Sequence, residues 1–281
     1  MKRLHISATV LPEIKGDERY FSRRVTSEEL EHLMDPVLSL EHFELTKNMG
    51  PQEHREVSSL HYIFEDSAPF VSLDSDGNNM IIYPGSLLWN WTGNGLIHTE
   101  SPVPEGALVE GIQILLKAHE NTRSKKPKSI HITDPQIPEI VDDGIKVKVI
   151  CGSTNTFMNK VEIPNTLTLL HIKMDHGKEF IHHLPPGWSG TLFAIEGRFD
   201  VITEHETLEM DEGMTVAMSD SDIRESIEIY AITKSDIILV SSDPRPGHPL
   251  LDNGTADLTV HGSKYRNRSL AVSANPPRPS A

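Results

Sequence analysis

Three side chains in the first hundred residues have the types and spacing of a metal site: His54, His98 and Glu100. Residues two apart on a strand point to the same face, so His98 and Glu100 share one face, and Gln52 and His54 share another. If both strands line one barrel interior, two imidazoles and a carboxylate meet there. Such a set leaves open positions on the ion and suits non-haem iron. The chain has 15 histidines, so a structural role for any pair competes with this interpretation.

Short β-strands must position these side chains. Apolar runs of five to nine residues recur along the chain, separated by turns such as Gly93-Asn94-Gly95. Many short strands with regular turns are typical of an all-β sandwich or barrel. Near the N-terminus, Thr26 and Glu29 form a capping box that predicts one short helix. Strands are predicted at 57–65, 79–83, 87–91, 108–116, 145–151, 166–174, 191–195, 199–203, 214–218, 227–232 and 236–240.

A weak sequence similarity between the two halves of the chain predicts two similar barrels. Residues 60–65 and 191–196 are both aromatic strands that end in Glu, and a Gly turn follows each. The total of 281 residues also fits two domains. We therefore expect an N-terminal barrel at 1–130 with the candidate metal site and a C-terminal barrel at 131–245 without a metal motif. Residues 246–281 form an extension, and its Pro-rich last part is predicted to be disordered.

The composition restricts the partners and the compartment. A formal net charge of −15 disfavours nucleic acid and anionic membranes, so no direct nucleic-acid binding is expected. The single cysteine, Cys151, excludes an internal disulfide and fits a reducing compartment. The N-terminus lacks a signal-peptide core, and no stretch approaches the roughly 20 apolar residues of a membrane span. We expect a cytoplasmic protein with no membrane contact.

The segments that carry the candidate ligands resemble the pirin family of bicupins. The segment 83–86 (YPGS), then Trp89, then 93–100 (GNGLIHTE), is similar to the family's second motif of R-P-G-D, Trp and G-x-G-x-x-H-x-E. The segment 52–55 (QEHR) resembles the first motif, H-x-H-R-G-x-E, and the spacing of eight from its His to Tyr62 matches. The likeness spans about residues 20–245, with a specific second motif and a degraded first one.

The resemblance implies two tandem cupin jelly-roll barrels, with iron in the N-terminal barrel held by three His and one Glu. Carried over by position, His54, His98 and Glu100 are ligands, and the first His position holds Gln52. The family's Gly after the Arg is Glu56 here. Members of the family are linked to quercetin-type dioxygenase activity or to transcriptional co-regulation.

Gln52 changes what the site can bind. An amide oxygen is as neutral as an imidazole but is a harder and weaker donor, better suited to Ca, Mg or Mn than to Fe or Cu. Three outcomes are open: a weakened Fe²⁺ site, a site retuned for another metal such as Mn, Ni or Cu, and a pocket without metal. Glu56, on the same predicted face as His54, offers a substitute carboxylate.

The sequence thus predicts a metal-dependent dioxygenase of quercetinase type that acts on an aromatic or enol-type small molecule, such as a flavonoid. Glu100 would be the catalytic base, and strand parity turns His61 away from the pocket. The alternative is a non-catalytic regulatory protein with a degenerate site and a protein partner. A sugar or small-acid isomerase on the same barrel is a third hypothesis. The predicted pocket walls are Leu60, Tyr62, Trp89 and Trp91.

Overall fold

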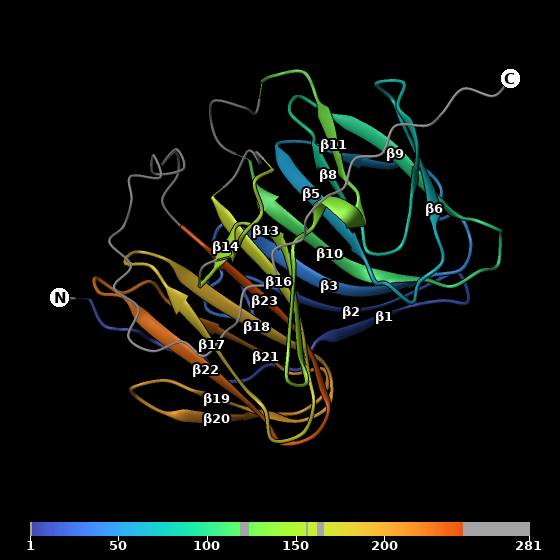
Figure 1. Ribbon diagram of the computed structural model, residues 1–281. Helices are drawn as coiled ribbons and strands as arrows, with labels where there is room; N and C mark the ends of the chain where they lie inside the picture. The colour runs from blue at the N-terminus through green and yellow to red at the C-terminus, as the bar shows by residue number, and fades with distance from the viewer. Residues whose placement is uncertain (1, 119–123, 156, 162–165, 244–281) are drawn as a thin grey trace, which may run out of the picture. The chain divides into compact units, whose positions relative to one another are not determined.

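The computed structural model describes residues 2–118, 124–155, 157–161 and 166–243. Four main antiparallel sheets make up this part of the chain, in two groups that are blue to green and yellow to orange in Figure 1. Among the described residues, no helix is long and apolar enough to cross a membrane. The predicted disordered segment at 269–281 lies outside the described residues.

The first barrel pairs a seven-stranded sheet with a four-stranded sheet. The four-stranded sheet has the order β4 (Gln52–His54), β9 (Leu96–Pro102), β6 (Phe70–Asp74) and β7 (Asn79–Ile82). The seven-stranded sheet has the order β1 (Glu13–Gly16), β2 (Tyr20–Thr26), β3 (Val37–Leu45), β10 (Val109–Lys117), β5 (Val57–Ile63), β8 (Leu87–Trp91) and β11 (Lys128–Ile132).

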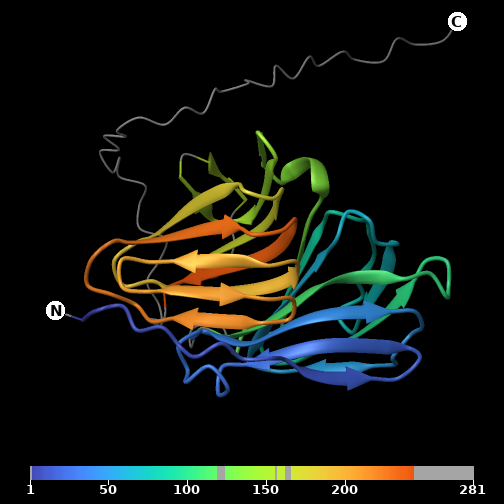
Figure 2. The same ribbon diagram turned by 90° about the horizontal axis from the view of Figure 1, so that it is seen from below.

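The second barrel repeats this plan, and Figure 2 shows its strands as neighbouring antiparallel arrows in yellow and orange. Its four-stranded sheet has the order β17 (Glu179–Leu184), β22 (Glu225–Ala231), β19 (Phe199–Ile202) and β20 (Thr207–Met210). Its six-stranded sheet has the order β12 (Glu139–Asp142), β13 (Ile145–Cys151), β16 (Leu167–Met174), β23 (Ser235–Ser242), β18 (Ser189–Glu196) and β21 (Thr215–Met218). The short pair β14 (Ser153–Thr154) and β15 (Phe157–Met158) and the 3₁₀ turn η1 (Asp134–Gln136) complete the elements.

Both faces of the central strands β3, β5 and β8 of the seven-stranded sheet are largely buried. Its inner face closes on the four-stranded sheet over a core that includes Phe43, Ile63, Phe70, Ile82, Leu88 and Val109. Its outer face packs against the second barrel in a shared core that includes Leu40, Leu60, Trp89, Leu169, Phe193 and Val240. Burial of such a side chain contributes about 1.5–3 kcal/mol. One face of the sheet therefore lines the interior of the first barrel, and the other face forms the contact with the second barrel.

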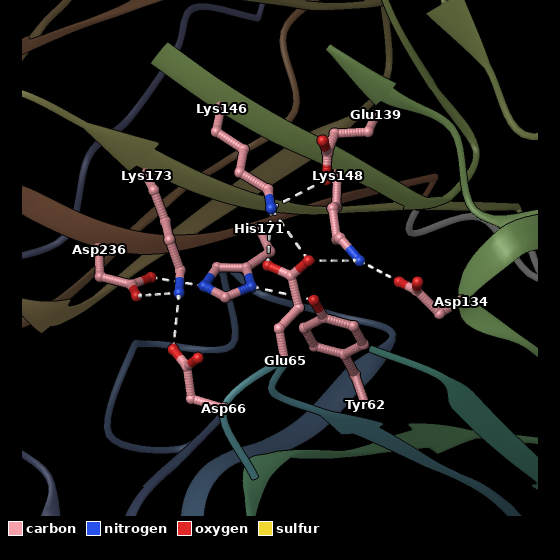
Figure 3. Close-up of polar contacts among 10 residues, drawn as sticks. All are labelled: Tyr62, Glu65, Asp66, Asp134, Glu139, Lys146, Lys148, His171, Lys173 and Asp236. Atoms are coloured by element: carbon pink, nitrogen blue, oxygen red, sulfur yellow. Dashed lines mark hydrogen bonds and ion pairs between the residues drawn. The ribbon is translucent and has the colours of Figure 1, made fainter. Parts of the chain in front are cut away.

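Polar side chains also join the two barrels, as Figure 3 shows. The Tyr62 hydroxyl on β5 lies 3.0 Å from Nδ1 of His171 on β16, and His171 Nε2 lies 2.5 Å from an Asp236 carboxylate oxygen. A carboxylate can only accept, so Nε2 donates to Asp236 and Nδ1 accepts from Tyr62. The contact between the barrels thus contains a chain of hydrogen bonds in which Tyr62, His171 and Asp236 are partners.

A cluster of opposite charges lies beside that chain of hydrogen bonds. The Glu65 carboxylate, just after β5, is 2.9 Å from the ammonium groups of both Lys146 and Lys148 on β13. Lys148 is almost fully buried and also contacts Asp134. A buried ammonium needs such partners, because an unpaired buried charge is strongly destabilising. Glu65 therefore ties the first barrel to the second.

The predicted N-terminal helix is wrong. The capping box forms, since Glu29 Oε2 accepts hydrogen bonds from the backbone N–H and the hydroxyl of Thr26, both at 2.7 Å. The chain then turns instead of continuing as a helix, because Glu31 and His32 adopt left-handed φ angles of 55° and 62°. Residues 27–36 are turns in which Leu30 and Met34 are buried.

Candidate metal centre

The strands β4 and β9 hold the four residues predicted at the site. Gln52 lies directly opposite His98 in the antiparallel register, and His54 lies opposite Leu96. Cross-strand partners share a face, so Gln52, His54, His98 and Glu100 all face the barrel interior. The imidazole rings of His54 and His98 lie 5.1 Å apart, centre to centre. The structure therefore brings the predicted residues together.

The structure adds His61, a residue that strand parity placed elsewhere. His61 lies on β5 in the opposite sheet and is buried, and its Nδ1 is 3.6 Å from Glu100 Oε1. His98 Nδ1 is 3.4 Å from the same oxygen, and the two rings lie 5.9 Å apart. The prediction that His61 points away from the pocket is wrong. The inward set includes three histidines and one glutamate.

A break between β4 and β5 explains that error. The parity argument treated residues 50–64 as one strand, but β4 ends at His54, and β5 begins at Val57 in the other sheet. Between them, Glu56 adopts a left-handed φ of 56°, which resets the alternation. The Glu56 side chain is exposed rather than inward-facing. The first motif of the pirin family has Gly at this position. That Gly was the sequence feature that could have predicted the turn.

Unpaired buried atoms are concentrated in this cluster. His54 Nε2, His61 Nδ1, both ring nitrogens of His98, and Glu100 Oε1 are all buried without a hydrogen-bond partner. Each such atom costs about 1–3 kcal/mol, and a bound ion is an ordinary explanation for a group of them. Donors that share one ion at about 2.1 Å lie about 3.0–3.4 Å apart, close to the distances here. The donors present therefore fit a divalent metal.

The imidazole rings of His54, His61 and His98 lie close together but do not all point to one ion position. Within the described ranges, no group of three or more His, Cys, Asp or Glu side chains is positioned to hold a metal ion as the side chains stand. The imidazoles would have to move for all of them to reach one ion.

The protonation states suit ligands. Burial lowers the pKa of His54 to about 4, and the neighbouring His98 and His61 add to this effect. Burial also lowers the pKa of His61. Burial alone would raise the pKa of Glu100, but the adjacent His61 and His98 outweigh it and hold that pKa below its usual value. The shifts of His54 and His61 favour neutral imidazoles and that of Glu100 favours a carboxylate, which are the forms that bind metals.

A pocket opens onto the cluster from the seven-stranded sheet. Its polar lining consists of Gln52, His61, Glu100 and Gln113, and its apolar lining consists of Tyr20, Phe43, Leu45 and Met49. The Tyr20 and Phe43 rings lie nearly parallel, with centres 6.3 Å apart. The predicted walls are wrong, because Leu60, Tyr62 and Trp89 face the second barrel in the shared core. Trp91 is not part of the pocket lining and contacts Lys125.

Two antiparallel barrels in tandem, with His and Glu side chains gathered inside the first, define a cupin protein of the two-barrel class. Within that class, the chain is similar to the pirin family. The Pirin family model matches residues 21–116. Human Pirin is 24% identical over 263 residues, which cover 90% of this chain and 86% of the human protein.

Solved structures confirm the predicted fold of two tandem cupin barrels. A quercetin 2,3-dioxygenase from Acinetobacter baumannii superposes with a TM-score of 0.74 at 19% identity, over 87% of this chain and 88% of that one. The pirin YhhW from Escherichia coli, solved in complex with nickel(II), gives 0.66 at 13% identity, over 86% and 100%. At these identities the similarity establishes the fold alone.

Proposed function

We propose that this protein is a member of the pirin family, binds a divalent metal in its first barrel and acts as a dioxygenase of quercetinase type. The observation that carries the proposal is the group of buried, unpaired donor atoms on His54, His98 and Glu100, of which Glu100 also lines a pocket. Two similar folds support it: one belongs to a quercetin 2,3-dioxygenase, and the other was solved with nickel(II). Fe²⁺ is the proposed metal, with Mn, Ni and Cu as alternatives.

The pocket lining offers groups that would contact a flat aromatic or enol-type substrate. The near-parallel Tyr20 and Phe43 rings provide an apolar wall, and the amides of Gln52 and Gln113 provide hydrogen-bonding groups for ring oxygens. A bound metal would offer open positions to oxygen atoms and stabilise negative charge on them. Glu100 Oε1 would accept the hydroxyl proton of an enol or phenol, since it is a carboxylate with no hydrogen-bond partner. A flavonol has both the flat ring and the acidic hydroxyl.

Oxygen consumption tests the dioxygenase. The protein is reconstituted anaerobically with Fe²⁺, and oxygen uptake is followed with several flavonols. We expect uptake that depends on metal and substrate, and a loss of at least about 100-fold in Glu100→Gln, which keeps the shape of the side chain but removes its basicity. The control variant Glu53→Gln, an exposed residue on the outer side of β4, should retain the activity. Absence of metal-dependent uptake with every flavonol would refute the dioxygenase.

Gln52 favours a second candidate, a non-catalytic regulatory protein that uses a protein partner. It occupies the position of a family His ligand, directly opposite His98. Metal analysis of protein purified without chelators separates the two candidates. A stoichiometric transition metal supports the enzyme, and a metal-free protein that gains metal in Gln52→His supports a degenerate site.

We also propose a cytoplasmic location. The sequence has a single cysteine, Cys151, which is buried and free, so the fold needs no oxidising compartment for an internal disulfide.

A further inference from the structure

We propose that His61 is a ligand of the metal and supplies the third imidazole that Gln52 no longer provides. This inference rests on the metal site of the proposed function and changes its ligand set. The set becomes His54, His61, His98 and Glu100, drawn from both sheets of the first barrel.

Position and burial support His61 as a ligand. Only 2% of the residue is exposed, and its Nδ1 is a buried polar atom without a hydrogen-bond partner. That nitrogen lies 3.6 Å from Glu100 Oε1, and the ring lies 5.9 Å from that of His98. A distance of 3.6 Å is too long for a hydrogen bond but close to the separation of two donors on one ion.

A purely structural role accounts poorly for His61. Among the described residues, the only ring that it contacts outside the cluster is that of Phe43, with ring centres 6.1 Å apart, and its cross-strand neighbour is Leu88. An apolar side chain would pack there without an unpaired nitrogen, whereas the imidazole leaves one at a cost of about 1–3 kcal/mol. A bound cation turns that cost into a favourable interaction.

Gln52 differs from His61 in these respects. Its side chain is half-buried, and neither of its amide atoms is among the buried atoms without a partner. It lines the pocket beside the cluster, where an amide is placed to contact a substrate. Three imidazoles and a carboxylate are a softer donor set than two imidazoles with an amide oxygen. The site should therefore prefer Fe, Co, Ni or Cu over Mg, Ca or Mn.

Metal binding by a matched set of variants tests the inference. Affinity for Co²⁺ or Ni²⁺ is measured by chelator competition, and the Co²⁺ absorption bands report the donor set without any assay of activity. We expect His61→Ala to weaken binding more than about 100-fold and to shift the bands, because a ligand is lost. Gln52→Ala should change affinity by less than about threefold. In the double variant His61→Ala/Gln52→His, the restored third imidazole should recover most of the affinity.

His131→Ala is the control variant. His131 lies on β11 opposite Leu88, on the same face of the same sheet as His61, and it also has a buried unpaired nitrogen, Nε2. Its removal should leave the metal affinity unchanged. Circular dichroism and thermal unfolding of each metal-free variant show whether a loss of affinity reflects a loss of fold.

The possible failures are distinguishable. If the wild-type protein binds no transition metal, both the proposed site and this inference are overturned. If the metal binds but no flavonol is oxidised, only the dioxygenase is refuted. If His54→Ala and His98→Ala abolish binding while His61→Ala does not, or if Gln52→Ala is the more damaging change, then the fourth ligand is not His61.

Discussion

Glu56 adopts a left-handed backbone conformation at the position where the first motif of the pirin family has Gly. A non-glycine residue costs about 1–2 kcal/mol there, and Gly itself costs about 0.4–1 kcal/mol through the freedom it gives the unfolded chain. Since the Glu56 side chain is exposed, Glu56→Gly should raise the free energy of unfolding by about 0.5–1 kcal/mol in urea titrations. Glu53→Gly, in strand β4, should lower it. An equal loss in both variants would show that the φ at residue 56 carries no strain.

The turn between β8 and β9 positions His98 and Glu100. Gly93 has a φ of +50°, and a Cβ there would lie 2.1 Å from the Lys125 carbonyl oxygen. Gly93→Ala should therefore destabilise the protein by about 2–4 kcal/mol and weaken metal binding, because β9 must shift to relieve the clash. Gly77→Ala is the matched control, since Gly77 also has a positive φ but no atom lies within 4 Å of the added Cβ. Thermal unfolding and chelator competition measure both effects, and equal losses would contradict the clash.

At the scale of elements, the sequence predicted strands well where apolar runs end in glycine turns. The predicted 57–65, 87–91 and 145–151 correspond to β5, β8 and β13 within two residues. It missed β1 and β2, whose side chains are mostly polar or half-exposed. It also assigned the wrong faces to β5, because a sheet buried on both sides carries no polar–apolar alternation to fix parity. The ligands on β9 were found because Gly93 and Gly95 mark its start.

At the scale of the whole molecule, Glu65 links acid stability to the contact between the barrels. Burial alone would raise its pKa, but the ammonium groups of Lys146 and Lys148 outweigh it and hold the pKa below 4.5. A lowered pKa in the folded state means that the carboxylate stabilises the fold above about pH 4.5 and that this contribution is lost as pH falls through the folded-state value. Asp236 beside His171 acts in the same direction.

Glu65→Gln should thus lower the free energy of unfolding by about 1–3 kcal/mol at pH 7, because two lysines lose a charged partner. The difference from the wild type should shrink as the pH falls through the folded-state pKa of Glu65, since the wild-type carboxylate is then protonated too. Urea unfolding at a series of pH values measures this. Asp66→Asn, an exposed neighbour at 3.9 Å from Lys173, serves as the control with little expected effect. A pH-independent difference for Glu65→Gln would show that lost packing, and not charge, is responsible.

The seven-stranded sheet places inward-facing His61 between Leu60 and Tyr62, which face the second barrel. A truncated protein that ends near residue 130 would keep all the candidate ligands but would uncover a broad apolar surface that the second barrel normally covers. Such a fragment should aggregate during expression. The second barrel thus covers an apolar surface that the first barrel cannot bury on its own. Substitutions on its docking face could abolish metal uptake without touching any ligand.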